Sequence, residues 1–197
     1  MYLIHTADGG DFLWLFLQTD NDYVYLDVVN LAEGKAVYAG SVSLMPCMSY
    51  TWDEESYDST EIIDAYTDPA SLRLMNHCDV LSTYHAYKSF RIGKDGMPEG
   101  DAGDLYLLPD NEEHTLTLNK DYSAEEISES GESLGKIALS KGAKLRIERT
   151  DGLDFADLRT EDGHLIRVTL DRSEGWANKT SDGEELFALF DGMMFAG

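Results

Sequence analysis

Three runs of strand-forming residues follow one another near the start of the chain. Residues 12–17, 23–29 and 36–42 are rich in β-branched and aromatic side chains, which favour strands because they pack well on a pleated surface. Residues 19–22 and 32–35 separate these runs and contain Asn, Asp and Gly, which tolerate the backbone angles of a tight reversal. The sequence therefore predicts an antiparallel meander.

The C-terminal part shows a second set of strand signals. Residues 144–149 alternate strictly, which places Leu145 and Ile147 on one face and the charges on the other. Asp162 and Gly163 stand between two further alternating runs, and Asp-Gly in that position is a strong hairpin signal. A short terminal helix is expected because four apolar residues have helical spacing before a glycine at 192: Leu186, Phe187, Leu189 and Phe190.

A polar stretch at residues 123–132 separates the two sets of signals. At 197 residues the chain is long enough for two small lobes with cores of their own. We therefore predict an N-terminal antiparallel β lobe at residues 1–130 and a C-terminal lobe at residues 131–197.

The C-terminal lobe resembles a bacterial SH3-like module. The resemblance lies in residues 139–147, in Asp162-Gly163 and in the late Gly175-Trp176 pair, and it implies a small barrel. The helical tail after Trp176 departs from that module. The predicted fold class is mainly β, with an N-terminal meander sheet and a C-terminal SH3-like small barrel that ends in a short helix.

A second resemblance covers most of the chain. Its residues are Asp68-Pro69, 79–87, 92–98, 149–152, Leu186-Phe187, 190–192 and 195–197. Together they look like a group of exported or lipid-anchored proteins of anaerobic gut bacteria with no assigned activity. The resemblance brings no catalytic residues and implies an extracellular or cell-envelope address. Because Met1 leads directly into apparent folded sequence, we expect that a signal segment has been removed ahead of it.

Charge limits the partners of this chain. Asp and Glu number 38 against 15 Lys and Arg, a formal net charge of −23, which repels nucleic acid and anionic membranes. The sequence has no apolar run of about 18 residues, so we predict no transmembrane segment. A glycan, a peptide or an envelope protein remains as a partner.

An acidic, aromatic loop at residues 45–64 is the predicted ligand-binding site. Trp52 lies there with Tyr50 and Tyr57, a composition suited to stacking on a sugar ring or docking a basic partner. The alternative is that Trp52 folds back as a lid over the core.

Two further features suggest bound groups or a covalent link. Asp95, Glu99, Asp101 and Asp104 could offer oxygen ligands to calcium in a loop whose glycines permit tight wrapping. The alternative is a solvated acidic loop, and we expect no other cofactor. Cys47 and Cys78 could form one disulfide in an oxidising compartment, or remain two buried thiols.

No catalytic motif stands out in this sequence. The histidines share no triad-like context, and a GxSxG elbow is missing. We therefore predict a non-catalytic binding module of the cell envelope or extracellular space and name no catalytic residue. Two alternatives stay open. One is a glycan-acting hydrolase that uses a carboxylate pair, and the other is a structural spacer within an exported protein.

Overall fold

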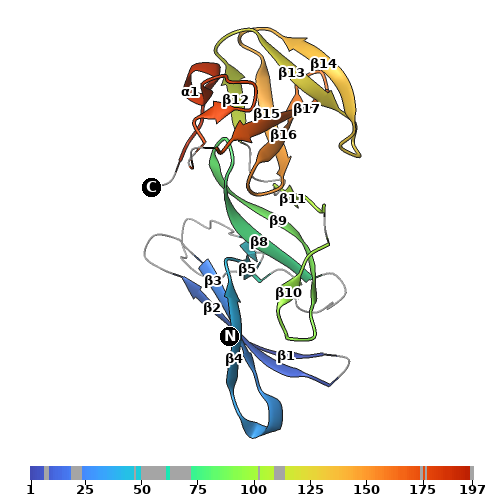
Figure 1. Ribbon diagram of the computed structural model, residues 1–197, viewed down its shortest axis with the longest axis vertical. Coiled ribbons are helices and arrows are strands. Elements are labelled where there is room, and N and C mark those ends of the chain that lie inside the picture. Colours follow the sequence, from blue (N-terminus) through green and yellow to red (C-terminus); the bar gives the residue numbers. More distant parts are fainter. Residues whose placement is uncertain are drawn as a thin grey trace. The chain divides into compact units, whose positions relative to one another are not determined.

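A computed structural model describes most of the chain (Figure 1). The described residues are 1–6, 9–18, 24–46, 48–49, 61–62, 72–101, 103–108, 114–173, 175 and 177–195. Strands dominate, and every strand pair given by the structure is antiparallel. The predicted mainly β class is therefore confirmed.

The chain divides into two compact units. The first unit consists of Met1–His77 and Tyr87–Asp104, and the second consists of Cys78–Ala86 and Leu105–Gly197. The boundary expected at residue 130 lies inside the second unit. The polar residues there form a tight hairpin turn, in which Ser128 N donates to Glu132 O at 2.8 Å.

The first unit contains a four-stranded meander sheet in the order β1-β2-β3-β4. It includes the three strands expected from the sequence and adds β1 at one edge. Their bounds are β1 Tyr2–His5, β2 Asp11–Gln18, β3 Val24–Asn30 and β4 Val37–Val42, with a 3-10 turn at Ala32–Gly34. The short strands that follow are β5 Met45–Pro46, β6 Met48–Ser49, β7 Glu61–Ile62 and β10 Pro98–Glu99. The longer β8 Leu72–Asp79 and β9 Thr83–Ile92 contribute residues to both units.

One face of the meander sheet packs into the core of the first unit. Phe12, Trp14, Leu26 and Val28 are buried there, and Trp14 Nε1 donates to Gly96 O at 2.8 Å. Gly96 has a φ of +80°, and a Cβ at this position would lie 2.3 Å from Phe12 Cδ1. The close approach of the 93–97 turn to the sheet therefore requires glycine at 96.

The second unit is built on the strand order β14-β13-β17-β16-β15. Its elements are β11 Tyr106–Leu107, β12 Thr115–Leu118, β13 Tyr122–Ile127, β14 Ser133–Leu139, β15 Lys144–Thr150, β16 Phe155–Thr160, β17 Leu165–Asp171, β18 Lys179–Thr180, α1 Leu186–Leu189 and β19 Phe190–Asp191. Within the described strands, β14 is an edge that pairs only with β13. The described strands thus form an open sheet, with no closed barrel among them, where the sequence predicted an SH3-like small barrel.

Several local predictions for the second unit agree with the structure. Leu145 and Ile147 are buried on one side of β15, as the strict alternation indicated. Gly163 turns the chain between β16 and β17, with Gly163 N donating to Thr160 O at 3.0 Å. The terminal helix α1 buries Leu186 and Leu189 and exposes Phe187. Within the part of the chain that the structure describes, no helix is both long enough and apolar enough to cross a membrane.

Candidate functional site

The predicted aromatic site lies outside the described residues. The structure does not describe Tyr50, Trp52 or Tyr57. Their role as a binding surface or a core lid therefore stays a prediction. Cys47 also lies outside the described residues. Its expected partner Cys78 lies near the end of β8 and is buried, and burial raises the pKa of the Cys78 thiol to about 12. The disulfide therefore stays a prediction as well.

The acidic loop expected to hold calcium is paired with an arginine of the preceding strand β9. Arg91 Nε donates to Glu99 Oε2 at 3.2 Å, and Arg91 also pairs with Asp101. Asp95 Oδ1 accepts a hydrogen bond from Met97 N at 3.0 Å, which closes a turn. Among the described residues, no group of three or more His, Cys, Asp or Glu could hold a metal ion. The structure thus uses three of the four predicted ligands, Asp104 excepted, in contacts within the protein.

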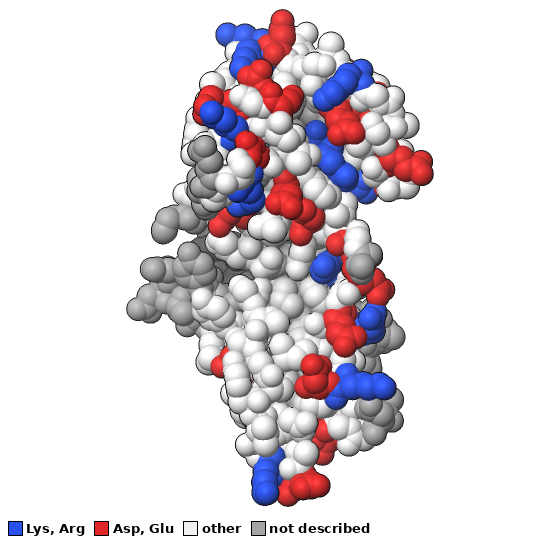
Figure 2. Space-filling view, in the orientation of Figure 1, with Lys and Arg blue, Asp and Glu red and all other residues white. Residues whose placement is uncertain are grey.

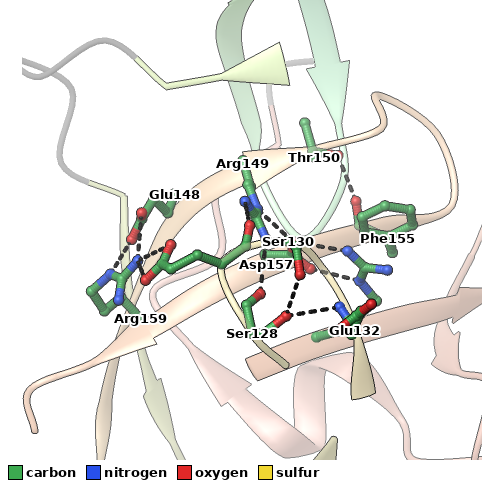
Figure 3. Close-up of polar contacts among 11 residues, drawn as sticks. Ser128, Ser130, Glu132, Glu148, Arg149, Thr150, Phe155, Asp157 and Arg159 are labelled. Atoms are coloured by element: carbon green, nitrogen blue, oxygen red, sulfur yellow. Dashed lines mark hydrogen bonds and ion pairs between the residues drawn. The ribbon is translucent and has the colours of Figure 1, made fainter. Parts of the chain in front are cut away.

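A buried carboxylate organises the polar side of the second sheet (Figure 3). Asp157 in β16 is fully buried and lies opposite Arg149 of β15 and Arg167 of β17. Its oxygens accept hydrogen bonds from Arg149 Nε at 2.7 Å and from Arg167 Nε and Nη2 at 2.7 and 2.9 Å. The Arg167 guanidinium also lies 3.8 Å from the centre of the Phe155 ring. Arg149 and Arg167, from the two neighbouring strands, are thereby both paired with one carboxylate.

The same network fastens the β13–β14 turn to the sheet. Arg149 Nη1 donates to Glu129 O at 2.8 Å. Arg159 Nη2 donates to Glu129 Oε1 at 3.0 Å and to Glu148 Oε1 at 2.8 Å. Figure 3 shows Ser128, Ser130 and Glu132 of the turn beside these groups. The network therefore links the turn to two strands through side chains.

Glu148 of this network does not have the raised pKa of a general acid. Hydrogen bonding from Arg159 lowers the pKa of Glu148, and burial opposes this only in part. A general acid instead requires a carboxyl group whose pKa is raised so that it keeps its proton near neutral pH. These carboxylates are suited to holding the sheet and turn together.

The candidate binding surface is the side of the meander sheet β1–β4 that faces away from the core of the first unit. Strand register places Leu3 of β1, Leu13 of β2, Val29 of β3 and Tyr38 of β4 in one continuous row. The next rows add Leu15 and Leu17 of β2 and Tyr25 of β3, because residues two apart on a strand share a face. We call this side the outer face, defined by the residues Leu3, Leu13, Leu15, Leu17, Tyr25, Val29 and Tyr38.

The outer face is apolar and open to solvent. Four of its side chains are exposed by 40% or more: Leu3 by 54%, Leu17 by 49%, Tyr25 by 40% and Tyr38 by 62%. Leu13, Leu15 and Val29 are half-buried. Contiguous exposed apolar surface of this kind marks interaction sites, whereas single exposed hydrophobic residues need no explanation.

Charge is nearly excluded from the outer face. Asp27 lies within it, paired in register with Leu15 and Ser41. His5 Nδ1 and Asp11 Oδ1 lie 2.7 Å apart at one end of the face. In the view of Figure 2, Lys, Arg, Asp and Glu crowd the second unit and are sparse over β2–β4. In a chain with 27% charged residues, such a face is a distinct surface.

The sequence contained a signal for this face that the prediction of a meander did not use. Residues 12–17 are apolar without interruption, although a strand with one solvated face is expected to alternate. The uninterrupted run therefore indicates a second apolar face.

No protein-family model matches this sequence, and neither curated proteins nor solved structures give a match.

Proposed function

We propose that this chain is a non-catalytic binding module that engages its partner through the outer face of the first sheet. The observation that carries the proposal is the apolar row Leu3, Leu13, Val29 and Tyr38, in which Leu3 and Tyr38 are exposed. Tyrosine and large aliphatic side chains on a surface poor in charge are typical of the centre of a protein interface. The proposal includes an address at the cell envelope or outside the cell, for which the resemblance to exported proteins is the support.

The carboxylates of the polar network have a structural role. Asp157, Glu148 and Glu129 are each engaged by arginine, so they form a scaffold around the β13–β14 turn. The outer face, in contrast, carries large apolar side chains that are exposed to solvent. Exposure of such side chains costs free energy that a bound partner recovers.

The test compares charged substitutions at two sites with similar exposure. Leu3→Glu combined with Tyr38→Glu changes the outer face. Leu134→Glu changes a leucine of the second unit that is 62% exposed and serves as the control. Each labelled protein is applied to arrays of bacterial envelope glycans and of peptides, and to immobilised wild-type chain.

Binding of one of these probes by wild type and Leu134→Glu, with loss in the outer-face variant, is the expected result. Thermal unfolding of all three proteins checks that the substitutions leave the fold intact. The proposal is wrong if a probe binds the outer-face variant as tightly as it binds wild type. Fractionation of the source cells tests the address, and a purely cytoplasmic protein would contradict it.

A further inference from the structure

We infer that the partner of the outer face is a second copy of this chain, so that two first-unit sheets pack face to face in a symmetric dimer. This inference rests on the proposed function and identifies the partner of the same surface. Its basis is the composition of both sides of the sheet, the near absence of charge on one side and the area of that side.

Both central strands of the sheet are apolar on both sides. In β2, Phe12 and Trp14 are buried in the core, while Leu13 and Leu17 belong to the outer face. In β3, Leu26 and Val28 are buried, while Tyr25 and Val29 belong to the outer face. Strands of this composition are typical of sheets covered on both faces. The sheet therefore has the composition of an inner layer, and a second layer completes it.

The chemistry of the outer face selects among partners. A basic protein would require carboxylates, but Asp27 is the one charged residue inside the face among the described residues. An anionic membrane surface is repelled by a chain of net charge −23. A glycan would find few hydrogen-bonding groups along the row from Leu3 to Tyr38. The complementary surface is apolar and nearly free of charge, and the same face of another copy has these properties.

The size of the face matches what a specific dimer requires. The four strands have 4, 8, 7 and 6 residues. At about 3.4 Å per residue and about 4.8 Å between strands, they cover about 400 Å² in projection. Because side chains protrude, the accessible area exceeds this projection. The smallest stable interfaces bury about 600 Å² on each partner. Two sheets packed in this way would lie about 10 Å apart with their strands nearly aligned.

The net charge of the chain gives the dimer a characteristic dependence on salt. Two copies of charge −23 repel each other, and the screening length falls from about 10 Å at 0.1 M salt to about 3 Å at 1 M. Association through a face that is nearly free of charge should therefore tighten as salt is added. A contact built on ion pairs would weaken under the same change.

Sedimentation equilibrium of the full chain tests the inference, at 0.05, 0.15 and 1 M sodium chloride. We expect a monomer–dimer equilibrium whose Kd falls as salt rises. Leu3→Glu and Tyr38→Glu, each measured alone, should raise the Kd about 100-fold, because symmetry places each change in the interface twice and each placement costs about tenfold. Asp27→Asn should lower the Kd, since it removes one negative charge from each face. Leu134→Glu should leave the Kd unchanged.

The outcomes separate this inference from the proposed function. A wild-type chain that is monomeric at all three salt concentrations overturns the dimer, and loss of glycan or peptide binding in the outer-face variant would then still support the binding module. A dimer that persists in both Leu3→Glu and Tyr38→Glu, with unchanged thermal unfolding, also overturns the inference because it uses another surface. A Kd that rises with salt, or that rises in Asp27→Asn, overturns it in favour of a basic partner surface.

Discussion

Replacement of Asp157 tests the network that organises the second sheet. Its carboxylate is fully buried and accepts three hydrogen bonds from Arg149 and Arg167, whose side chains are 15% and 21% exposed. Asp157→Ala removes the carboxylate that lies between the two guanidinium groups on either side of β16. Breaking a buried ion pair by removing one partner costs about 3–5 kcal/mol.

The residual exposure of the two arginines places the expected cost at the lower end of that range. Because each guanidinium can recover some contact with water, we expect Asp157→Ala to lower the free energy of unfolding by about 3 kcal/mol. Asp157→Asn keeps the shape and one acceptor oxygen, so we expect a smaller loss, about 2 kcal/mol. The matched control is Asp154→Ala, which removes an exposed carboxylate 3.9 Å from Arg172 and should change stability by less than about 0.5 kcal/mol.

Urea unfolding followed by hydrogen exchange and mass spectrometry measures these differences. Peptides from the second unit report the change, and peptides from residues 1–46 act as an internal reference because two units need not unfold in one step. A loss below about 1 kcal/mol for Asp157→Ala would refute the reasoning. It would mean that water solvates Arg149 and Arg167 well enough to make the buried carboxylate dispensable.

Three further predictions follow from individual side chains. Arg159 lowers the folded-state pKa of Glu148, so this pair stabilises the fold above the ordinary glutamate pKa, and the contribution is lost as pH falls through the lowered value. Wild type should therefore lose more stability than Glu148→Gln in urea titrations from pH 6 to pH 3. Parallel stability curves for the two proteins would contradict this. Burial raises the pKa of the Cys78 thiol to about 12, so iodoacetamide at pH 8 under reducing conditions should label Cys78 only after the protein unfolds. Peptide mapping measures the labelling, and rapid labelling of the folded protein would contradict the prediction. Gly96→Ala should lower the free energy of unfolding by about 2–4 kcal/mol, because residue 96 has a positive φ and the new Cβ would overlap Phe12. Gly103→Ala is the control, at φ +89° with open space around it, and should cost about 1 kcal/mol. Equal costs in thermal or urea unfolding would show that Phe12 moves aside.

The sequence allowed prediction of the strands wherever local chemistry determines the structure. The turns at residues 32–35 and 162–163 and the alternation in β15 are local features, and the structure shows each of them. The chain does not divide into units at the polar stretch 123–132, because hydrogen bonds within the turn and from Arg149 to Glu129 O hold this segment to the sheet. Long-range pairing of this kind leaves no local signal.

The candidate site was predictable only in part. The uninterrupted apolar run at residues 12–17 indicates that β2 has two apolar faces, but it does not indicate that Leu3 and Tyr38 extend the outer face. That extension depends on strand register, which β1 and β4 acquire from their pairing with β2 and β3. The abundance of Asp and Glu also hid Asp157 among 38 acidic residues, because burial distinguishes it and sequence does not.

Neither compact unit is a continuous stretch of chain, and this affects how the protein is made. Residues Cys78–Ala86 belong to the second unit, where Val80 and Leu81 are fully buried and Ser82 Oγ donates to Met194 O at 2.8 Å. During synthesis this short segment leaves the ribosome well before Met194 is added to the chain. Its apolar side chains can therefore be buried as in the native structure only after the later residues of the second unit have been made. A gene fragment that encodes residues 105–197 alone would lack the segment altogether. Dissection of the protein into separately expressed halves should therefore cut the chain in three places or not at all.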